Sequence, residues 1–332
     1  MIISRTPFRV SFFGGGTDYP QWFQEHQGAV LATTIDKYCY ISCRYLPPFF
    51  DHKSRIIYSK MEHVKTVDEI DHPAVREALK FLKIKEGVEI HHDGDLPART
   101  GLGSSSAFTV GLLNALYALK GIMTTKERLA QEAIFVEQER CKENVGCQDQ
   151  TLAAFGGLNY IEFGGSRHLR VTKVTISSET LKSLEDHLMM FFTGFSRKAS
   201  DIAFHQIQNI PKKKHELNAM YQMTTEAVEI LNSKKILDFG KLLHESWTLK
   251  RSLSDKITNP HIDELYQTAR NAGAVGGKLL GAGGGGFILL FAHPKRQAKI
   301  RQALKNALEI PFKLENLGTQ IIFYQPNSGK VI

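Results

Sequence analysis

Apolar residues recur along this chain at two spacings, every second residue in some stretches and every three or four in others. The first spacing is typical of β-strands and the second of amphipathic helices. Strands are predicted over 2–13, 158–163, 169–176, 188–192, 287–291 and 320–324, and helices over 73–81, 108–119, 124–141, 200–209, 215–232, 236–253, 262–272 and 295–308. Residues 30–43 are expected to form two paired strands around a turn at Asp36 and Lys37. A change of composition after residue 176 predicts a domain boundary near 185, which divides the chain into 1–185 and 186–332.

Glu137 breaks the polarity pattern of the helix predicted over 124–141. It falls on the same side of that helix as the apolar residues Ala130, Ala133 and Cys141. An unpaired carboxylate in apolar surroundings is strongly unfavourable, so a cation or a basic partner is expected beside it. Thr124, with Glu127, is the expected cap of this helix.

A glycine loop at 94–107 stands between a predicted strand and the helix predicted over 108–119. Glycines let main-chain N–H groups turn inward, and a helix N-terminus adds unpaired donors and partial positive charge. The loop therefore predicts an anion site, although an ordinary serine cap after a flexible turn is the alternative. The residues expected to bind nucleotide phosphates are Pro97, Gly101, Leu102, Gly103, Ser104, Ser105 and Ser106.

Three further polar residues lie in positions that suit either structure or chemistry. Asp18 follows three glycines, and it either caps a helix at 21–23 or binds a ligand hydroxyl. Asp149 lies in a short polar link, where a structural cap and a catalytic role are equally open. Arg9 is surrounded by apolar neighbours in the first predicted strand.

Composition and charge narrow the class of protein. The 332 residues are 42% hydrophobic and 23% charged, which is ordinary for a globular protein, and the net charge is +8. Lys and Arg are spread along the chain apart from Lys212–Lys214, and no nucleic-acid motif accompanies them, so an anionic small molecule is the expected partner rather than nucleic acid.

The apolar run 287–292 is too short to span a membrane. No secretory signal and no CxxC spacing among the four cysteines is found, so a cytoplasmic protein is expected. The sequence leaves the oligomeric state open.

Several nucleotide and hydrolase motifs are excluded by their context. Gly281, Gly283 and Gly286 match GxGxxG, but a strand follows them where a dinucleotide site needs a helix. Residues 273–278 lack the spacing of a phosphate-binding GxxxxGK loop, and neither HExxH nor GxSxG occurs.

Phosphoryl transfer, in contrast, is a reaction for which this chain contains every required group. It needs a phosphate cradle, a magnesium site, a group that orients the attacking hydroxyl, and positive charge on the transferring group. The loop 101–106 is the expected cradle, and Ser105 with Glu137 is the expected Mg²⁺ site, since Mg²⁺ commonly takes only one or two protein oxygens. Asp149 is the expected base and Arg9 the fixed cation.

Three separated motifs together resemble the GHMP small-molecule kinases. The motifs are Pro7–Val10 with Gly14–Tyr19, then Pro97–Ala107, then Leu280–Phe287. The resemblance implies an α/β (α+β) chain of two domains, an N-terminal α/β domain and a C-terminal ferredoxin-like domain, with the active site between them. It also implies ATP and Mg²⁺ as cofactors, Ser105 and Glu137 as metal ligands, and Asp149 and Arg9 as catalytic residues. The residues expected to contact substrate are Gly14, Gly15, Gly16, Thr17, Asp18, Gly283, Gly284 and Gly285.

Within the family, the chain most resembles the D-glycero-D-manno-heptose 7-phosphate kinase subgroup. Galactokinases carry Glu-His where this chain has Gly15-Gly16, so a carboxylate that grips sugar hydroxyls is missing. The resemblance implies phosphorylation of the anomeric hydroxyl of a sugar phosphate, for surface polysaccharide synthesis. Arg197 and Lys198 are expected to bind the distant phosphate. The alternatives are a galactokinase-like or fucokinase-like kinase of an unphosphorylated sugar, and a non-catalytic nucleotide or sugar sensor.

Overall fold

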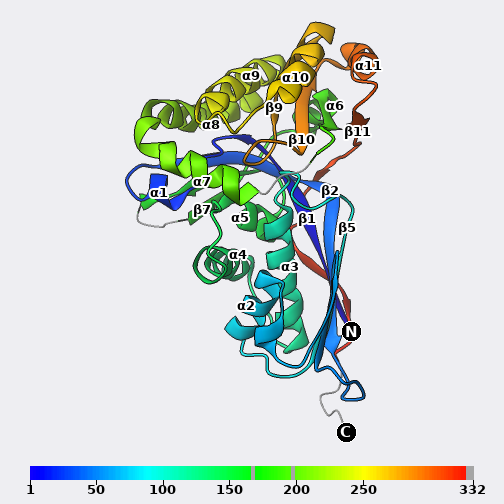
Figure 1. Ribbon diagram of the computed structural model, residues 1–332. Coiled ribbons are helices and arrows are strands. Elements are labelled where there is room, and N and C mark those ends of the chain that lie inside the picture. Colours follow the sequence, from blue (N-terminus) through cyan, green and yellow to red (C-terminus); the bar gives the residue numbers. More distant parts are fainter. Residues whose placement is uncertain (166–168, 196–198, 327–332) are drawn as a thin grey trace.

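The computed structural model describes residues 1–165, 169–195 and 199–326 (Figure 1). The strands are β1 Ile2–Phe13, β2 Gly28–Tyr45, β3 Ser54–Ile57, β4 Met61–Val64, β5 Val88–Gly94, β6 Asn159–Phe163, β7 Leu169–Lys173, β8 Leu188–Phe192, β9 Ala274–Leu279, β10 Phe287–Ala292, β11 Leu308–Glu309, β12 Leu314–Glu315 and β13 Gln320–Tyr324. The helices are α1 Pro20–Phe23, α2 Pro73–Phe81, α3 Ser104–Leu119, α4 Lys126–Phe135, α5 Gln148–Phe155, α6 Ser178–His187, α7 Ala199–Asn209, α8 Lys214–Ser233, α9 Ile236–Ser252, α10 Pro260–Ala272 and α11 Pro294–Ala303. The mixed helix and sheet fold predicted from the sequence is confirmed.

Two sheets organise the described residues. The first contains nine strands along the path β13-β1-β2-β5-β3-β4, with β12 and β6 also paired to β2 and β7 paired to β6. The second contains four strands in the order β11-β8-β10-β9. The strands β12 and β13 come from the end of the chain and yet belong to the first sheet. The boundary expected near 185 stays a prediction; that position lies in α6, just before the first strand of the second sheet.

The expected turn at Asp36 and Lys37 is wrong, because β2 runs without interruption from Gly28 to Tyr45. Its first half pairs with β6 and its second half with β5, so the strand changes partners near this point. The polar groups at the change of partner are satisfied by Lys313. Asp36 N–H donates to the Lys313 carbonyl oxygen at 3.0 Å, and the Lys313 N–H donates to the Asp36 Oδ1 at 2.9 Å.

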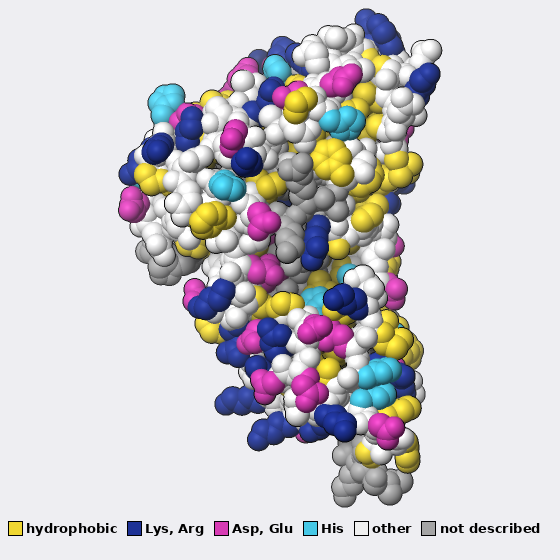
Figure 2. Space-filling view, in the orientation of Figure 1, with side chains coloured by type: hydrophobic (Ala, Val, Ile, Leu, Met, Phe, Trp, Pro, Cys, Tyr) yellow, Lys and Arg dark blue, Asp and Glu magenta, His cyan; other side chains and the backbone are white. Residues whose placement is uncertain are grey.

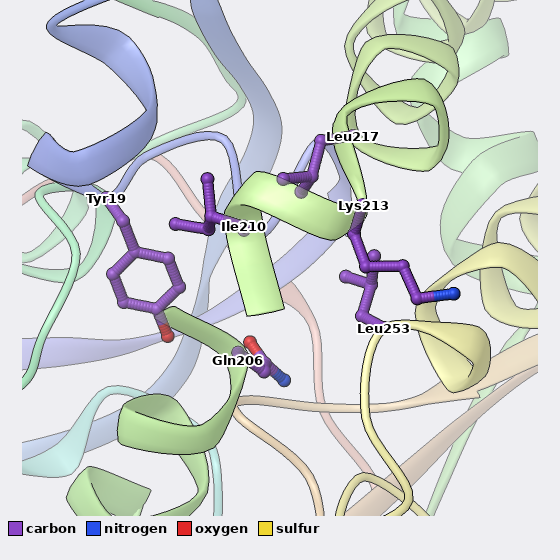
Figure 3. A pocket seen from close by; sticks show the side chains of 7 residues that line it. Tyr19, Gln206, Ile210, Lys213, Leu217 and Leu253 are labelled. Atoms are coloured by element: carbon purple, nitrogen blue, oxygen red, sulfur yellow. The ribbon is translucent and has the colours of Figure 1, made fainter. Parts of the chain in front are cut away.

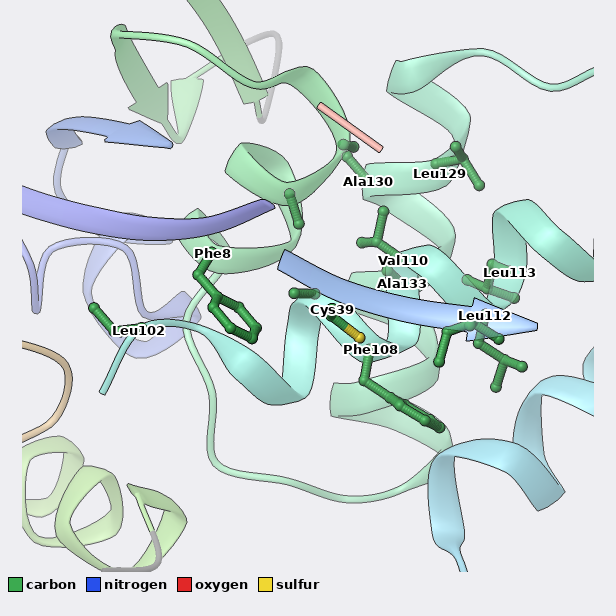
Figure 4. Close-up of a cluster of buried hydrophobic side chains, with 14 of the residues drawn as sticks. Phe8, Cys39, Leu102, Phe108, Val110, Leu112, Leu113, Leu129, Ala130 and Ala133 are labelled. Carbon is green, nitrogen blue, oxygen red and sulfur yellow. The ribbon is translucent and has the colours of Figure 1, made fainter. Parts of the chain in front are cut away.

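Helix α3 packs within a buried apolar cluster that also contains residues of β1, β2 and α4 (Figure 4). It lies against β1 and β2 on one side and against α4 and α5 on another, and Figure 1 shows α2, α3 and α4 on one side of the long strands. Val110, Leu112 and Leu113 are fully buried, as is Leu102 just before the helix. Each such side chain contributes roughly 2 kcal/mol of burial free energy. The packing therefore fixes the N-terminus of α3, which the glycine loop leads into.

Helix ends differ from the predicted ones in two places. Thr125 caps α4 by accepting the Arg128 N–H, and Thr124, the expected cap, does not. Beyond α4 the chain continues as one π-helical segment, Val136–Arg140. Helix α11 ends at Ala303, short of the predicted 308, because Leu308 and Glu309 form β11 and pair with β8.

Candidate active site

The second and third glycine motifs are in backbone contact. A Cβ atom at Gly101 would lie 2.3 Å from the Leu280 carbonyl oxygen, and one at Gly281 would lie 2.4 Å from the Gly101 Cα. Both glycines have positive φ, at +80° and +76°. The Phe287 N–H donates to the Thr100 carbonyl oxygen across the same contact, at 3.2 Å. Only glycine permits this approach, so the sheet that carries β10 is held directly against the loop of the expected phosphate site.

The loop ends in the first turn of α3. Gly103 is the helix N-cap in the left-handed region, with φ of 71°. The first turn consists of Ser104, Ser105 and Ser106, of which Ser105 is exposed and Ser106 is buried. The N–H groups of a first turn have no partner within the helix and, with the helix dipole, favour an anion. The geometry suits the expected phosphate site, and the binding roles of Pro97 and residues 101–106 stay predictions.

Arg9 and Asp149 form a bidentate ion pair beneath this turn. The Arg9 Nε donates to Asp149 Oδ1 at 2.7 Å, and Nη2 donates to Oδ2 at 2.8 Å. The remaining Arg9 nitrogen, Nη1, donates to the Gly101 carbonyl oxygen at 2.5 Å. The Arg9 side chain is 5% exposed and that of Asp149 25%. Strand β1 and the first turn of α5 thus bring together the two residues expected to be catalytic, with the carboxylate open to the site.

Glu137 is buried in the π-helical segment, as its place on the apolar side predicts. Its Oε2 accepts hydrogen bonds from the hydroxyl of Ser106, at 2.9 Å, and from the side-chain amide of Gln150. Burial and the charge of Glu143 raise the pKa of Glu137 to about 7. In the described part of the chain no basic residue pairs with it, so neutral donors stand where a cation or basic group was expected.

The hydrogen bonds of Glu137 involve a different serine from the one expected to bind magnesium. The serine bonded to Glu137 is Ser106, whereas Ser105, the expected ligand, lies one position earlier on the exposed side of the turn. Glu137 Oε1 is buried and has no hydrogen-bond partner among the described residues. Those residues contain no group of three or more Asp, Glu, His or Cys side chains that could hold a metal ion by themselves, but Mg²⁺ needs only one or two protein oxygens when phosphates supply others. The residues fit the ion, and the ligand roles of Ser105 and Glu137 stay predictions.

Asp18 ties the first glycine motif to the segment that carries Asp149. Its Oδ1 accepts the Gly16 N–H at 2.9 Å, and its Oδ2 accepts the Gln148 side-chain amide at 3.0 Å. The N-cap of α1 is Tyr19, without a side-chain bond, so Asp18 does not cap that helix. Burial raises the pKa of Asp18 above its ordinary value, and the neighbouring charge of Asp149 adds to this. Thr17 likewise bonds within the motif, to the Gly14 and Ala29 carbonyl oxygens.

Two buried lysines near these groups were not among the residues predicted from the sequence. Lys250 of α9 donates to the Gly281 carbonyl oxygen at 2.6 Å, and Lys278 of β9 donates to the Phe12 carbonyl oxygen at 2.8 Å. Burial, and secondly the charge of Arg9, lower the pKa of Lys250 to about 8. The signal that identified Glu137 was present here too, since Lys250 follows the buried Trp247 by three positions on the apolar side of its helix.

The remaining expected substrate residues divide into two groups. Arg197 and Lys198 lie outside the described residues. Gly283, Gly284 and Gly285 pack against the chain itself: the Gly284 N–H donates to the Ile257 carbonyl oxygen at 2.8 Å, and a Cβ at Gly285 would lie 2.7 Å from the Phe195 ring. Their substrate roles stay predictions.

A small, mostly apolar pocket lies beside Gly16, on the first motif (Figure 3). Tyr19, from the first motif, and residues of the second half of the chain line it together: Gln206, Ile210, Lys213, Leu217 and Leu253. On the face shown in Figure 2, basic and acidic side chains are mixed over the surface. No helix among the described ranges is long and apolar enough to cross a bilayer.

Comparisons with known proteins agree with this geometry. The family signature of the GHMP kinases N terminal domain matches residues 71–157, and that of the GHMP kinases C terminal matches 227–310. The first match contains the glycine loop, Glu137 and Asp149, and the second contains Lys250 and the loop 281–286. Together the two matches span more than half of the chain.

Relatives match over most of the chain. The D-glycero-alpha-D-manno-heptose 7-phosphate kinase of Campylobacter jejuni subsp. jejuni serotype O:2 is 29% identical over 318 residues, which cover 92% of this chain and 93% of that protein. The mevalonate kinase of Pyrococcus horikoshii is 28% identical over 77% of this chain and 75% of its own. The bifunctional fucokinase/GDP-fucose pyrophosphorylase of Arabidopsis thaliana is 26% identical over 93% of this chain and 32% of its own.

Solved structures share the fold. A D-glycero-D-manno-heptose 1-phosphate kinase from Bacteriodes thetaiotaomicron superposes with a TM-score of 0.78 at 22% identity, covering 96% of this chain and 98% of its own. Lactococcus lactis galactokinase, complexed with galactose, superposes with a TM-score of 0.73 at 17% identity, covering 96% and 94%. With both domain signatures, the fold and the site in agreement, the chain belongs to the GHMP kinase family and is an ATP-dependent phosphotransferase with an alcohol group as acceptor.

Proposed function

We propose that this enzyme transfers the γ-phosphoryl group of ATP to the anomeric hydroxyl of D-glycero-D-manno-heptose 7-phosphate, in the cytoplasm. The observation that carries the proposal is the bidentate pair of Arg9 and Asp149 beneath the first turn of α3. The heptose is proposed because the relative that matches 92% of the chain carries that activity in its name. All four cysteines are free, which suits a reducing compartment.

Asp149 is the group that acts on the sugar hydroxyl. Its carboxylate is the more exposed member of the pair and is held in one orientation by two hydrogen bonds from Arg9. A fixed carboxylate can align the hydroxyl and accept its proton as the oxygen attacks phosphorus. Arg9 remains charged throughout and stabilises the negative charge that develops on the transferring group.

The phosphates of ATP are proposed to lie on the first turn of α3, where the N–H groups and serine hydroxyls converge. Ser105 and Glu137 would hold Mg²⁺ there. When bound, the ion neutralises charge on the phosphate oxygens. Glu137 would then be ionised, and its second oxygen, Oε1, has no other partner among the described residues. The positive charge of Arg9, with the Lys250 ammonium close by, adds to the attraction for an anionic pair of substrates.

The phosphate already on the sugar is proposed to bind at Arg197 and Lys198. The first motif has glycines at positions 15 and 16, so the carboxylate that galactokinases present there is missing, and Asp18 is the remaining carboxylate of that loop. A dianionic phosphate offers strong charge-assisted hydrogen bonds to Arg and Lys instead. An unphosphorylated sugar remains the second candidate, because a protein of Arabidopsis thaliana named as a bifunctional fucokinase/GDP-fucose pyrophosphorylase matches 93% of this chain over 32% of its own length.

The test is ADP release with ATP and Mg²⁺ across a panel of sugars and their phosphates. The expected result is turnover with heptose 7-phosphate far above turnover with free heptose, fucose, galactose or mevalonate, and ³¹P NMR of the product should show a new anomeric phosphate. Equal efficiency with free heptose would overturn the phosphate-anchored substrate. Absence of ADP release with every sugar would favour a non-catalytic sensor.

A further inference from the structure

The position of Gly15 leaves a small gap, and the three atoms nearest to it are polar. A Cβ atom placed there would have as its nearest neighbours Gln148 Nε2 at 3.6 Å, Ser11 Oγ at 3.6 Å and Lys250 Nζ at 3.8 Å. These are ordinary contact distances, so the space holds about one heavy atom beyond the glycine. We call this space, bounded by Ser11, Gln148 and Lys250, the Gly15 gap.

One of the polar atoms at the gap has no partner. Ser11 is 5% exposed, and its Oγ makes no hydrogen bond to any described residue. The Gln148 atom at the gap, Nε2, already donates a hydrogen bond to Asp18 Oδ2 at 3.0 Å. Buried polar groups are normally satisfied, and leaving one unsatisfied is unfavourable. The unpartnered Ser11 hydroxyl therefore points to a polar ligand atom that binds beside it.

Lys250 adds a positively charged hydrogen-bond donor to the gap. Its ammonium has three N–H groups, and one of them is used on the Gly281 carbonyl oxygen. The gap thus offers a spare cationic donor from Lys250 and a hydroxyl from Ser11 that can donate or accept. A hydroxyl group matches this pair, because it accepts from the ammonium and donates to the Ser11 oxygen. An apolar group would leave the Ser11 hydroxyl unsatisfied.

The gap also lies next to the reacting groups. Gln148 directly precedes Asp149, and Gly281 is the residue whose backbone touches Gly101 of the phosphate loop. The charges that face Lys250 are those of Arg9, Asp18, Asp149 and Lys278. A sugar whose hydroxyl reaches Asp149 therefore has a second polar contact close by.

We infer that the Gly15 gap receives a second hydroxyl of the sugar, and that Lys250 is a specificity-determining residue that donates a hydrogen bond to it. The inference rests on the proposed function, since it assumes that the acceptor is a sugar. It also explains the glycine: where a galactokinase-like loop would present a carboxylate, this chain presents space and reaches the sugar with a lysine from α9.

The sharpest variant is Gly15→Ala. The backbone of Gly15 is outside the left-handed region, and the new methyl would meet no atom closer than 3.6 Å, so the fold should tolerate it. The methyl would fill the gap and exclude the hydroxyl. We expect KM and Kd for heptose 7-phosphate to rise by about tenfold or more, with KM for ATP and the melting temperature nearly unchanged.

Lys250→Met tests the donor, and Lys241→Met is its matched control. Lys241 lies on the same helix with a side chain that is 66% exposed. Lys250→Met should raise KM for the sugar by about tenfold or more and KM for ATP little, whereas Lys241→Met should change neither. A sugar series that lacks one hydroxyl at a time should include one analogue whose binding is no longer weakened by Gly15→Ala.

Measuring sugar binding by calorimetry separates the two proposals. If the wild-type chain binds the sugar phosphate without ADP release, the proposed function fails, while the ratio of Kd values for Gly15→Ala still decides the role of the gap. If Gly15→Ala binds and turns over the sugar like the wild type, the gap holds only water and the inference is overturned. The same conclusion follows if Lys250→Met folds with unchanged KM.

Discussion

Arg9 and Asp149, 140 positions apart in the chain, are joined by two side-by-side hydrogen bonds of 2.7 and 2.8 Å. The arginine is nearly buried and the carboxylate is a quarter exposed. This pairing gives the carboxylate one fixed orientation at the open side of the site, and it makes each residue's contribution depend on the other.

Asp149→Asn should lower kcat by roughly a hundredfold or more, because the amide cannot take the proton of the sugar hydroxyl. KM for ATP should change little, since the first turn of α3 is untouched. Steady-state kinetics with ATP and heptose 7-phosphate measure both, and Glu127→Gln, an exposed carboxylate on α4, is the control. Near wild-type turnover in Asp149→Asn would mean that this residue only holds Arg9 in place.

Arg9→Lys should keep the positive charge at this position but lose the pair of parallel hydrogen bonds to Asp149. An ammonium cannot make two parallel bonds to Asp149 and a third to the Gly101 carbonyl oxygen in the way that guanidinium does. We expect kcat to fall by about a hundredfold and the melting temperature to fall as well. Arg128→Lys, whose side chain is half exposed, should affect neither. An unchanged kcat in Arg9→Lys would show that charge alone is required.

Glu137→Gln should raise the concentration of Mg²⁺ needed for half-maximal activity without unfolding the protein. The amide has nearly the same shape as the carboxylate and removes a buried charge, so the melting temperature above pH 7 should rise or stay the same. The pKa of Glu137 is raised to about 7 in the folded protein, so ionisation of this carboxyl opposes folding. The loss of folding stability is complete above pH 7 and is absent at a pH below the ordinary pKa of a carboxyl group. A lower melting temperature with an unchanged Mg²⁺ requirement would contradict the metal role.

His72 should make the fold sensitive to acid. It stacks on Phe108 of α3, with ring centroids 4.6 Å apart, and burial lowers its pKa to about 4. In the unfolded chain the group takes up its proton near pH 6.5, so its contribution to stability is present above pH 6.5 and is lost as pH falls toward 4, by up to about 1.4 kcal/mol per pH unit.

The measurement for His72 is urea unfolding between pH 7.5 and 4.5 for the wild type and His72→Phe. Other groups also titrate in this range, so the informative quantity is the difference between the two proteins. The variant should gain stability relative to the wild type as pH falls. A difference that stays constant with pH would mean that His72 is protonated in the folded state as easily as in the unfolded chain.

Elements with local determinants were predicted well. Helix α2 begins at Pro73 and strand β8 covers Leu188–Phe192, as the sequence indicates, because each is set by nearby proline or by a short apolar run. The burial of Glu137 followed from helical spacing alone. The roles of neighbouring serines could not be separated in this way: Ser105 and Ser106 differ by one step around the helix, and which of them faces Glu137 depends on how α3 packs.

Long-range partners account for the other differences. The turn expected at Asp36 is absent because Lys313, 277 positions away, satisfies its polar groups within a continuous strand. Lys250 of α9 donates a hydrogen bond to Gly281, 31 positions later in the loop between β9 and β10, and no local pattern reveals this contact. Its position on the apolar side of α9 was nevertheless visible in the sequence. A charged residue at such a position needs a buried partner, for Lys250 as for Glu137.

The pairing of β13 with β1, in which Ile2 faces Tyr324, governs the order in which the protein can be assembled during its synthesis. Strand β1 acquires its outer neighbour only when residues 320–324 have also emerged, after the whole loop 281–286 has been made. Until then one edge of β1 is open and able to pair with another chain. A nascent chain stalled before residue 314 should therefore bind chaperones, and release of the final strands should protect the N-terminal amides from hydrogen exchange.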